Sequence, residues 1–494
     1  MRIVHISSEA VPWAKTGGLA DVTAALTAYL SGNGHDVSLY LPLYRSVREA
    51  GFEPGAPVLE LGPEELGLPA TAAIRPLAGP HGLRVRLVDA PALFDRPGLY
   101  GDDAGDYPDN LFRFAVFCRA ALCGLEEVPE ILHLHDWQTA LAPVLLEAGP
   151  PPGAGGLSRT KPASIMTLHN LAYQGRFPAE NWPDTGLPTE WFRSDRLEYY
   201  GGINLLKGGM IAADQVTTVS PTYAREIATP EYGFGLEGVV GGLSRPVTGI
   251  LNGIDTVTWN PAADALLDVS YDATDRSGKA LLKRELLAEF GLDGEPDLPL
   301  FGFISRLVDQ KGLPLIEALA DRLATWPARF VFLGSGEARY ERLFERLDAD
   351  LPNVGARVAF SERLAHLIEA GSDFFLMPSA FEPCGLNQMI SQRYGTIPVV
   401  HEVGGLADSV VAATPETIAE GRATGIVFRL YDPDTFGSAI DQALAVYDTP
   451  AQMESLIRAA MATDFSWDAS GRAYEQLYEA MKSDQSRQES TRGR

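Results

Sequence analysis

Short apolar runs alternate with longer segments of helical periodicity along almost the whole chain. Most of these runs are continuous rather than alternating in polarity, which is typical of strands buried on both faces of a sheet. We expect strands at residues 2–6, 37–41, 85–89, 131–134, 163–168, 215–219, 300–304, 329–333, 354–359, 374–377 and 397–400. Helical patterns lie between them at residues 18–31, 111–123, 205–213, 313–324, 340–348, 365–370 and 387–394. This strand–helix rhythm predicts parallel, doubly wound α/β sheets.

A segment that contains glycine and asparagine, residues 249–255, separates two such series of strands. We therefore expect an N-terminal domain at residues 1–250 and a C-terminal domain at residues 251–465. A C-terminal helix at residues 466–481 is expected to return to the N-terminal domain. The polar tail at residues 482–494 is expected to be disordered.

The composition is that of an ordinary globular protein with a strongly acidic balance. The chain has 494 residues, of which 46% are hydrophobic and 21% charged, and its formal net charge is −25. Affinity for nucleic acids and anionic membranes comes largely from clustered Lys and Arg, so neither is an expected partner. A few local cations would still be enough to bind a diphosphate.

Cysteine usage and the N-terminus indicate the cytoplasm. The three cysteines, Cys118, Cys123 and Cys384, have no metal-site spacing and do not suggest a disulfide framework. The opening apolar stretch is too short for a signal peptide, and no run reaches the roughly 18 apolar residues of a spanning helix.

A glycine-rich turn follows the first expected strand, with the sequence KTGGLADV at residues 15–22. Gly17 and Gly18 would let backbone N–H groups approach an anion at the start of a helix. Lys15 adds a formal positive charge, and Asp21 could cap the helix or bind a sugar hydroxyl. The alternative is a glycine-rich turn that binds nothing.

A second basic turn follows the strand expected at residues 300–304 and carries Arg306 and Lys311. Ligands of open α/β sheets bind at the carboxyl ends of the strands, where both turns are expected. Two cations here could neutralise the charge that grows on a departing diphosphate, which would stabilise the transition state. Simple solvation of both side chains is the alternative.

The segment SAFEPCGLN, residues 379–387, lies between a buried strand and a helix. Glu382 could bind sugar hydroxyls or stabilise a developing oxocarbenium ion, and Gly385 could offer backbone N–H groups to a phosphate. A helix cap is the alternative for this segment. Cys384 is better explained as a small packing residue than as a nucleophile. Further on, Gly404 and Gly405 could line a phosphate pocket or simply form a tight turn.

Histidines mark two further strand ends. His169, next to Asn170, is placed to bind a sugar hydroxyl, although a lone histidine is often structural. His133 and His135 share one face of a strand, but no third ligand lies nearby in the sequence, so no metal site is expected.

Taken in order, these motifs resemble those of bacterial glycogen synthases and plant starch synthases. Further stretches carry the resemblance: VSPTYAREI at residues 219–227, YGFGLEG at 232–238, LNGID at 251–255 and FSWD at 465–468. The resemblance runs from Met1 to about Tyr478. It implies a GT-B fold, in which two Rossmann-like, doubly wound parallel-sheet domains face a central cleft.

The resemblance also implies the reaction. Enzymes of this family transfer glucose from ADP-glucose to the non-reducing end of an α-1,4-glucan such as glycogen, with retention at the anomeric carbon. The implied mechanism is a front-face displacement in which the leaving phosphate helps to deprotonate the acceptor hydroxyl. No metal or cofactor is implied, and ADP-glucose is a substrate. UDP-glucose as donor, or a paralogue that binds glucan without turnover, are the alternatives.

Site residues follow from the resemblance position by position. The residues matched to catalytic positions are Glu382, His169, Lys311, Arg306 and Asp21. Those matched to donor-binding positions are Lys15, Gly17, Gly18, Asn252, Phe360, Cys384, Gly385, Leu386, Gly404 and Gly405. Phe360 stands where the family usually has an aromatic residue against the adenine.

The chain departs from the family pattern at three places. Gln138 replaces a common histidine, Ala380 replaces a common arginine, and His-Glu-Val at residues 401–403 replaces basic residues and a threonine. These departures bear on donor preference, acceptor choice and rate rather than on the fold.

Overall fold

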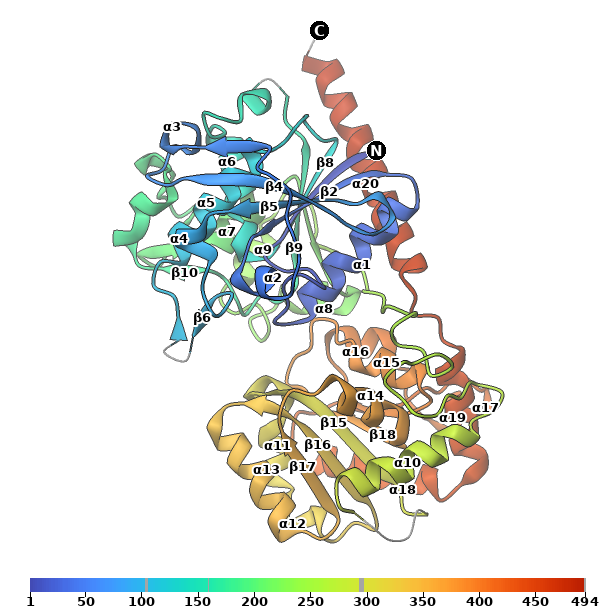
Figure 1. Cartoon of the computed structure of the whole chain (residues 1–494). Helices are drawn as coiled ribbons and strands as arrows, with labels where there is room; N and C mark the ends of the chain where they lie inside the picture. Colours follow the sequence, from blue (N-terminus) through green and yellow to red (C-terminus); the bar gives the residue numbers. More distant parts are fainter. Residues whose placement is uncertain (103–104, 159, 293–296, 493–494) are drawn as a thin grey trace. The chain divides into compact units, whose positions relative to one another are not determined.

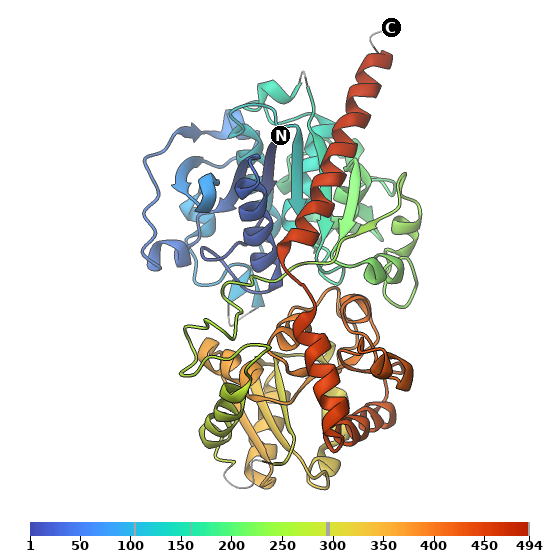
Figure 2. The same ribbon diagram turned by 90° about the vertical axis from the view of Figure 1, so that its right-hand side faces the viewer.

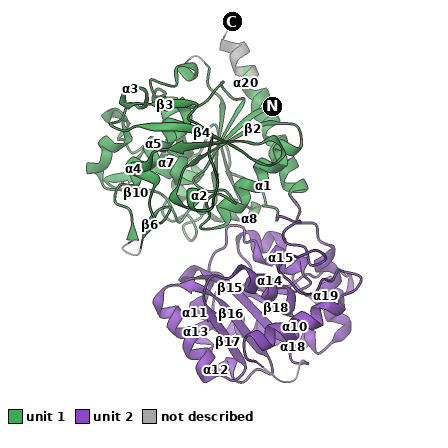
Figure 3. Ribbon diagram, viewed as in Figure 1, with its two compact units in different colours: residues 1–253, 467–494 green, residues 254–466 purple. Residues whose placement is uncertain are grey.

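The computed structural model describes the chain except residues 103–104, 159, 293–296 and 493–494 (Figure 1). The chain forms two compact units (Figure 3). Unit 1 comprises Met1–Gly253 and Trp467–Arg494, and unit 2 comprises Ile254–Ser466. The division therefore falls close to the boundary expected between residues 250 and 251, and the C-terminal segment belongs to unit 1.

Unit 1 is built on a nine-stranded sheet in the order β14-β13-β9-β8-β1-β2-β5-β4-β3. Its strands are β1 (Arg2–Ile6), β2 (Asp36–Pro42), β3 (Leu59–Leu61), β4 (Ala72–Ala78), β5 (Arg84–Asp89), β8 (Ile131–His135), β9 (Ala163–Leu168), β13 (Gln215–Thr218) and β14 (Thr248–Gly249). The smaller strands are β6 (Gly101–Asp102), β7 (Gly105–Asp106), β10 (Arg176–Phe177), β11 (Glu198–Tyr199) and β12 (Gly202–Asn204).

One edge of this sheet corrects the expectation of wholly parallel sheets. Strand β4 runs antiparallel to β5, and β3 runs antiparallel to β4. Only residues 79–83, which contain the short turn Pro80–Gly82, join β4 to β5. Parallel neighbours need a crossover of a dozen or more residues, so a connection this short forces the antiparallel arrangement. The remaining pairings, from β14 to β5, are parallel.

Helices lie on both sides of the unit 1 sheet, as Figure 1 shows. The helices of unit 1 are α1 (Gly18–Gly32), α2 (Arg45–Glu49), α3 (Pro63–Leu66), α4 (Pro91–Phe94), α5 (Asn110–Cys123), α6 (Leu141–Ala148), α7 (Leu205–Ala212), α8 (Pro221–Glu226), α9 (Glu237–Gly241) and α20 (Trp467–Arg492).

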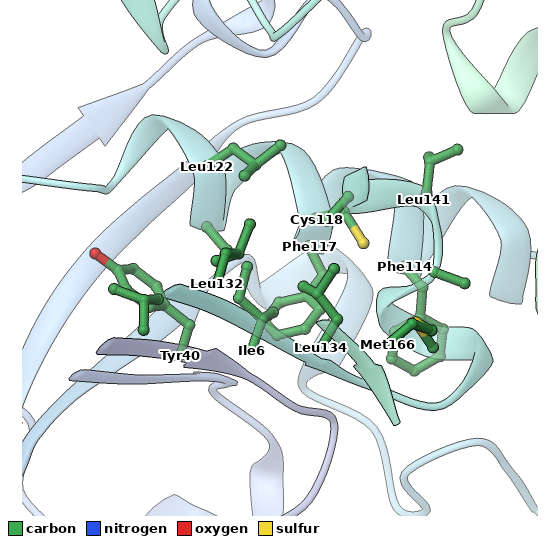
Figure 4. Close-up of a cluster of buried hydrophobic side chains, with 14 of the residues drawn as sticks. Ile6, Tyr40, Phe114, Phe117, Cys118, Leu122, Leu132, Leu134, Leu141 and Met166 are labelled. Atoms are coloured by element: carbon green, nitrogen blue, oxygen red, sulfur yellow. The ribbon is translucent and has the colours of Figure 1, made fainter. Parts of the chain in front are cut away.

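Helix α5 packs its side chains onto the central strands of unit 1 (Figure 4). Phe117 and Cys118 of α5 lie near Leu132 and Leu134 of β8 and Met166 of β9, and all five are fully buried. Burial raises the pKa of the Cys118 thiol to about 12, so this cysteine is an inert packing residue. Cys123 and Cys384 are also buried, and none of these three cysteines forms a disulfide within the described part of the chain.

Unit 2 has a six-stranded sheet in the order β17-β16-β15-β18-β19-β20, and every pairing in it is parallel. Its strands are β15 (Leu300–Leu307), β16 (Arg329–Gly336), β17 (Val354–Val358), β18 (Phe374–Met377), β19 (Ile397–His401) and β20 (Ile426–Phe428). Its helices are α10 (Ser277–Glu289), α11 (Leu313–Ala318), α12 (Ala320–Leu323), α13 (Ala338–Asp350), α14 (Glu362–Gly371), α15 (Asn387–Arg393), α16 (Gly404–Ser409), α17 (Pro415–Ala419), α18 (Pro433–Tyr447) and α19 (Pro450–Ala462).

Helix α20 joins the C-terminal segment to the rest of unit 1. Figures 1 and 2 show it, in red, beside the blue helix α1. Its Tyr478 hydroxyl lies 2.7 Å from Nδ1 of the buried His133 in β8. The helix continues to Arg492, so the expectation of disorder from residue 482 is wrong as far as that residue. No Gly or Pro occurs between residues 482 and 492, and each added helical residue gains a backbone hydrogen bond.

None of the helices that the structure describes, α20 included, combines the length and the apolar sequence needed to cross a membrane.

Candidate functional site

The expected site residues divide between the two units. Unit 1 holds Lys15, Gly17, Gly18, Asp21, His169 and Asn252, and unit 2 holds Arg306, Lys311, Phe360, Glu382, Cys384, Gly385, Leu386, Gly404 and Gly405. Each group is described within its own unit below.

Strands β15, β18 and β19 are neighbours in unit 2, so the segments that follow them meet at one edge of the sheet. We call residues 306–312, 378–386 and 403–405 the three-loop cluster. Gly312 has φ +79°, and a Cβ built on it would lie 2.0 Å from the carbonyl oxygen of Pro378. Only glycine allows these two loops to approach so closely.

An ion pair lies at the centre of the three-loop cluster. Nζ of Lys311 donates to Oε2 of Glu382 at 2.7 Å, and the Ser379 hydroxyl donates to the same oxygen at 2.9 Å. The Glu382 side chain is 7% exposed and that of Lys311 20% exposed. The two side chains that the sequence assigned to different parts of a ligand therefore contact each other directly.

Arg306 contributes a second cation at the end of β15. Its side chain is exposed, and no residue that the structure describes forms an ion pair with it. The guanidinium is therefore available to an anionic ligand, and its fork of N–H donors suits phosphate oxygens.

Gly404 and Gly405 pack against the Glu382 loop. A Cβ on Gly404 would lie 2.0 Å from the carbonyl oxygen of Glu382, and one on Gly405 would lie 2.1 Å from that of Cys384. The backbone N–H of Gly405 donates to the carbonyl of Glu382 at 3.1 Å. These contacts favour the tight-turn alternative for the glycine pair, since the Gly405 donor is already used.

In unit 1, the carboxylate of Glu9 binds the backbone of the glycine-rich turn at residues 15–22. Its Oε2 accepts hydrogen bonds from the backbone N–H groups of Thr16 at 2.5 Å and Gly17 at 3.3 Å. Its Oε1 accepts from the hydroxyls of Thr16 and Tyr100, both at 2.6 Å. Glu9 was not among the residues predicted from the sequence, although a carboxylate three residues beyond a buried strand was a visible signal. An internal carboxylate, rather than a ligand, therefore orders this turn.

Lys15 and Asp21 form an ion pair of 2.8 Å at the surface of the same turn. Their side chains are 49% and 35% exposed. Pairs of this exposure contribute little to stability, so both groups can exchange partners readily.

His169 follows β9 and begins a row of imidazoles that leads into the sheet. Its Nε2 lies 3.0 Å from Nδ1 of His135, whose Nε2 lies 3.0 Å from Nδ1 of His5. With His133 these residues form what we call the histidine cluster. Burial lowers the pKa of His5 and of His169 to about 3 and that of His135 well below its usual value, so these rings are neutral.

The parallel pairing of β1 with β8 creates this cluster, because it sets His5 opposite His133. No third histidine lies near His133 and His135 in the sequence, because His5 is distant along the chain. The visible signal was that each of the two strands carries histidine, so that aligning them by these residues would have placed His5 next to His133.

The histidine cluster suits hydrogen bonding better than metal binding. Ligand atoms of His5, His133 and His135 all lie within 4.8 Å of one another. Both ring nitrogens of His133 are already engaged, with the Tyr478 hydroxyl at 2.7 Å and Thr167 Oγ1 at 2.5 Å. A metal ion would have to break these contacts and those between the rings.

Asp136 lies beside this cluster in a strained conformation. Its φ of 57° and ψ of −176° belong to a region that is essentially restricted to glycine. Its Oδ1 accepts from the backbone N–H of His169 at 2.7 Å. Burial raises the pKa of its carboxyl to about 7, although backbone hydrogen bonds from His169 and Asn170 oppose the rise. Asp136 was not among the residues predicted from the sequence, and its strained backbone and raised pKa make it a further candidate for the site.

Comparisons with known proteins identify the family. A family model described as "Starch synthase catalytic domain" matches residues 2–241, and one described as "Glycosyl transferases group 1" matches residues 289–459. "Glycogen synthase 1" of Methylococcus capsulatus is 43% identical over 97% of this chain and 96% of that protein. "Glycogen synthase 2" of Geobacter sulfurreducens is 45% identical over 97% and 98%. The chain belongs to the glycogen and starch synthase family.

Solved structures agree with this family assignment. The catalytic domain of starch synthase IV from Arabidopsis thaliana, bound to ADP and acarbose, has a TM-score of 0.87 and 35% identity. The match covers 98% of this chain and 99% of that one. A sucrose-phosphate synthase from Thermosynechococcus elongatus, at a TM-score of 0.61 and 16% identity, shows likeness of fold alone. The expectation of a GT-B fold with two doubly wound α/β domains is confirmed.

Two of the three departures from the glycogen and starch synthase pattern, those at His401 and Ala380, lie in or against the three-loop cluster. Nδ1 of His401 lies 2.8 Å from the carbonyl oxygen of Ser379, which can only accept, so Nδ1 carries the proton. The Ser379 hydroxyl in turn donates to Glu382. The Ala380 N–H donates to the carbonyl of Gln310 at 2.9 Å. Gln138 is buried, and its Oε1 has no hydrogen-bond partner among the described residues.

The remaining donor positions of this family member differ in exposure. Phe360 follows β17 and is 89% exposed, which leaves its ring free to stack on a planar group. Asn252 is buried, and its Oδ1 makes no hydrogen bond to any described residue. Cys384 is buried, Gly385 has φ +72°, and Leu386 is the N-cap residue of α15.

Proposed function

We propose that this chain is a glycogen synthase. It transfers glucose from ADP-glucose to the non-reducing end of an α-1,4-glucan, with retention at the anomeric carbon. The observation that carries the proposal is the identity of 41–45% with curated glycogen synthases over nearly the full chain. The motifs that bear the chemistry are present in both units.

The three-loop cluster of unit 2 is the proposed site for the leaving diphosphate. Cleavage of the bond between glucose and the nucleotide places growing negative charge on the phosphate oxygens. Arg306 and Lys311 are the cations that would stabilise that charge, and their stabilisation grows as the bond breaks. Glu382, held by Lys311 and Ser379, offers a carboxylate to the positive charge that develops on the sugar.

Unit 1 is proposed to bind the sugar and to exclude water from the reacting bond. His169 offers a neutral imidazole at the end of β9, and Lys15 and Asp21 offer exposed polar groups at the first turn. The acceptor hydroxyl would lose its proton to the departing phosphate on the same face of the sugar. This route needs neither a metal nor a cofactor, and their absence from the reaction stays a prediction, as does a cytoplasmic location.

ADP-glucose is preferred to UDP-glucose as the proposed donor because the Arabidopsis starch synthase is described as bound to ADP. The exposed Phe360 supports a site for a purine, since a larger aromatic base gains more from stacking. The departures from the family pattern at residues 401–403 bear on this donor preference.

Parallel assays with two donors test the proposal. Purified protein is incubated with glycogen and either ADP-[14C]glucose or UDP-[14C]glucose, and label in precipitated glycogen is counted. Faster incorporation from ADP-glucose is the expected result. Preference for UDP-glucose would overturn the donor assignment alone, and incorporation from neither by a folded protein would overturn the proposed function.

A further inference from the structure

Three histidines of unit 1, His5, His135 and His169, form a linear series of hydrogen-bonded rings, which we call the histidine file. Nδ1 of His5 in β1 meets Nε2 of His135 in β8 at 3.0 Å, and Nδ1 of His135 meets Nε2 of His169 at 3.0 Å. His5 and His135 are fully buried, whereas His169 is half-buried at the end of β9. The file therefore leads from the interior of the sheet to the candidate site.

Neutral rings in such a file must all point the same way. A neutral imidazole has one N–H donor and one bare acceptor nitrogen. If His135 receives a hydrogen bond from His5 at Nε2, its proton is on Nδ1 and it donates to His169. If His135 instead donates to His5, it must accept from His169. Only these two arrangements make both hydrogen bonds.

The inner end of the file decides between the two arrangements. Nε2 of His5 is enclosed and has no hydrogen-bond partner among the described residues. In the arrangement that points inward, this nitrogen would carry a buried N–H without an acceptor. In the arrangement that points outward, it is a bare nitrogen instead. Buried N–H groups without acceptors are rarer in proteins than unsatisfied acceptors, so the outward arrangement is favoured.

We propose that His5 and His135 are positioning residues that hold His169 in the tautomer with its proton on Nδ1. The inward-facing Nε2 of His169 accepts from His135, and Nδ1–H is left to donate. Nδ1 of His169 has no partner among the described residues and is not one of their enclosed, unpartnered atoms. It is therefore accessible to a ligand oxygen.

The proposal deepens the proposed function, on which the identity of the ligand rests. In a glucosyltransferase, His169 would donate a hydrogen bond to a hydroxyl oxygen of the transferred sugar and would not act as a base. His133 takes no part in the file, because Tyr478 and Thr167 occupy its two ring nitrogens. It acts as a spacer whose ring stacks on His135, with centroids 4.4 Å apart.

Nitrogen NMR tests the tautomer without reference to activity. Full-length protein labelled with [15N]histidine contains eight histidines, and the signals of His169 are assigned by comparison with His169→Gln. The expected result is a protonated, pyrrole-type Nδ1 and an unprotonated, pyridine-type Nε2 in His169. A protonated Nε2 with a bare Nδ1 would overturn the proposal. This outcome is independent of whether glucose transfer is observed.

Two variants of His5 then test the effect on catalysis. His5→Phe keeps the ring volume but removes the donor, whereas His5→Asn keeps an N–H donor at the position of Nδ1. We expect His5→Phe to lower kcat for glucose transfer about 10-fold, with the KM for glycogen unchanged, and His5→Asn to recover most of the loss. Equal rates in the two variants would overturn the positioning role.

Metal analysis of the purified wild-type protein tests the remaining alternative, in which the histidine cluster binds a metal ion. The proposal predicts less than stoichiometric zinc, and no change in rate after dialysis against a chelator. One equivalent of tightly bound metal that is lost in His5→Phe would overturn it, because a metal ion on these nitrogens cannot coexist with the hydrogen-bonded file.

Discussion

The three-loop cluster of unit 2 contains an ion pair, whereas the histidine cluster of unit 1 contains neutral rings. In unit 2, Arg306 lies at the end of β15, Lys311 and Glu382 lie in the segments that follow β15 and β18, and Lys311 and Glu382 form an ion pair. In unit 1, burial lowers the pKa of His5 and of His169 to about 3. The comparison indicates that unit 2 stabilises charge, whereas unit 1 controls the direction of hydrogen bonds.

Removing a charge from the three-loop cluster should have the largest effect. We expect Lys311→Ala to lower kcat for glucose transfer by roughly 10²–10³, because it removes a cation that acts on the leaving phosphate. Steady-state kinetics with ADP-glucose and glycogen measure the change. Arg193→Ala, which removes an exposed cation paired with Asp195, is the matched control and should keep the wild-type rate. A near-native rate in Lys311→Ala would contradict the role of this cluster.

The close packing of the three-loop cluster gives a second test. In Gly405→Ala the new Cβ would lie 2.1 Å from the carbonyl oxygen of Cys384, so the Glu382 loop must shift. We expect the free energy of unfolding to fall by about 1–3 kcal/mol and kcat to fall with it. Urea denaturation measures stability. Gly238→Ala is the control, because its new Cβ would meet no described atom within 4 Å apart from its chain neighbours and the backbone of its own helix. Equal stability of the two variants would show that the loops are not tightly packed.

Asp136 offers a further test of this comparison between the units, because it is a carboxylic acid next to the neutral histidine rings of unit 1. Its pKa is raised to about 7 from 3.8, so the folded state binds its proton more tightly than the unfolded state does. The stability that this gives is fully present below about pH 4 and is lost as the pH rises towards 7. Asp136→Asn should therefore be more stable than wild type at pH 8, by about 1–3 kcal/mol, with a smaller difference at pH 4.

Urea denaturation of wild type and Asp136→Asn at both pH values checks this prediction. A difference that does not depend on pH would mean that the Asp136 carboxylate is ionised in the folded protein throughout this range.

A smaller effect on stability is expected at His133, the member of the histidine cluster that bonds Tyr478. Tyr478→Phe removes the hydroxyl that bonds Nδ1 of the buried His133 and leaves that nitrogen without its partner. We expect the free energy of unfolding to fall by about 1–2 kcal/mol, with kcat unchanged, because His133 lies outside the row that reaches His169. Thermal and urea denaturation measure the loss. A large fall in kcat would show that His133 and α20 influence the site directly.

Continuous apolar runs were enough to predict the strands that form the centres of both sheets. The run at residues 2–6 is strand β1, and residues 374–377 are β18. The antiparallel edge of unit 1 was missed because β3 has only three residues and β4 carries mixed polarity, with an arginine and a proline inside the strand, a pattern that local periodicity does not separate from loops. The length of helix α20 was missed because a polar sequence is equally compatible with a solvated helix and with a disordered tail.

Site residues were predictable where a motif carried them and not where the sheet brought them together. Lys311 and Glu382 each stood in a recognisable segment, but their ion pair depends on the order of β15 and β18 in the sheet. His5 joined the histidine cluster only through the register of β1 with β8. The position of Glu9, three residues beyond a buried strand, was visible in the sequence, but its backbone N–H partners in the turn were not, because they depend on how the turn folds back.

The stereochemistry of the product tests the central claim most directly. The enzyme is incubated with ADP-[1-13C]glucose and a short maltooligosaccharide, and the labelled anomeric carbon of the product is observed by NMR. The account predicts a new α-1,4-linked glucose at the non-reducing end, formed by wild type and strongly reduced in Lys311→Ala. A β-linked product, or release of free glucose without transfer, would contradict it.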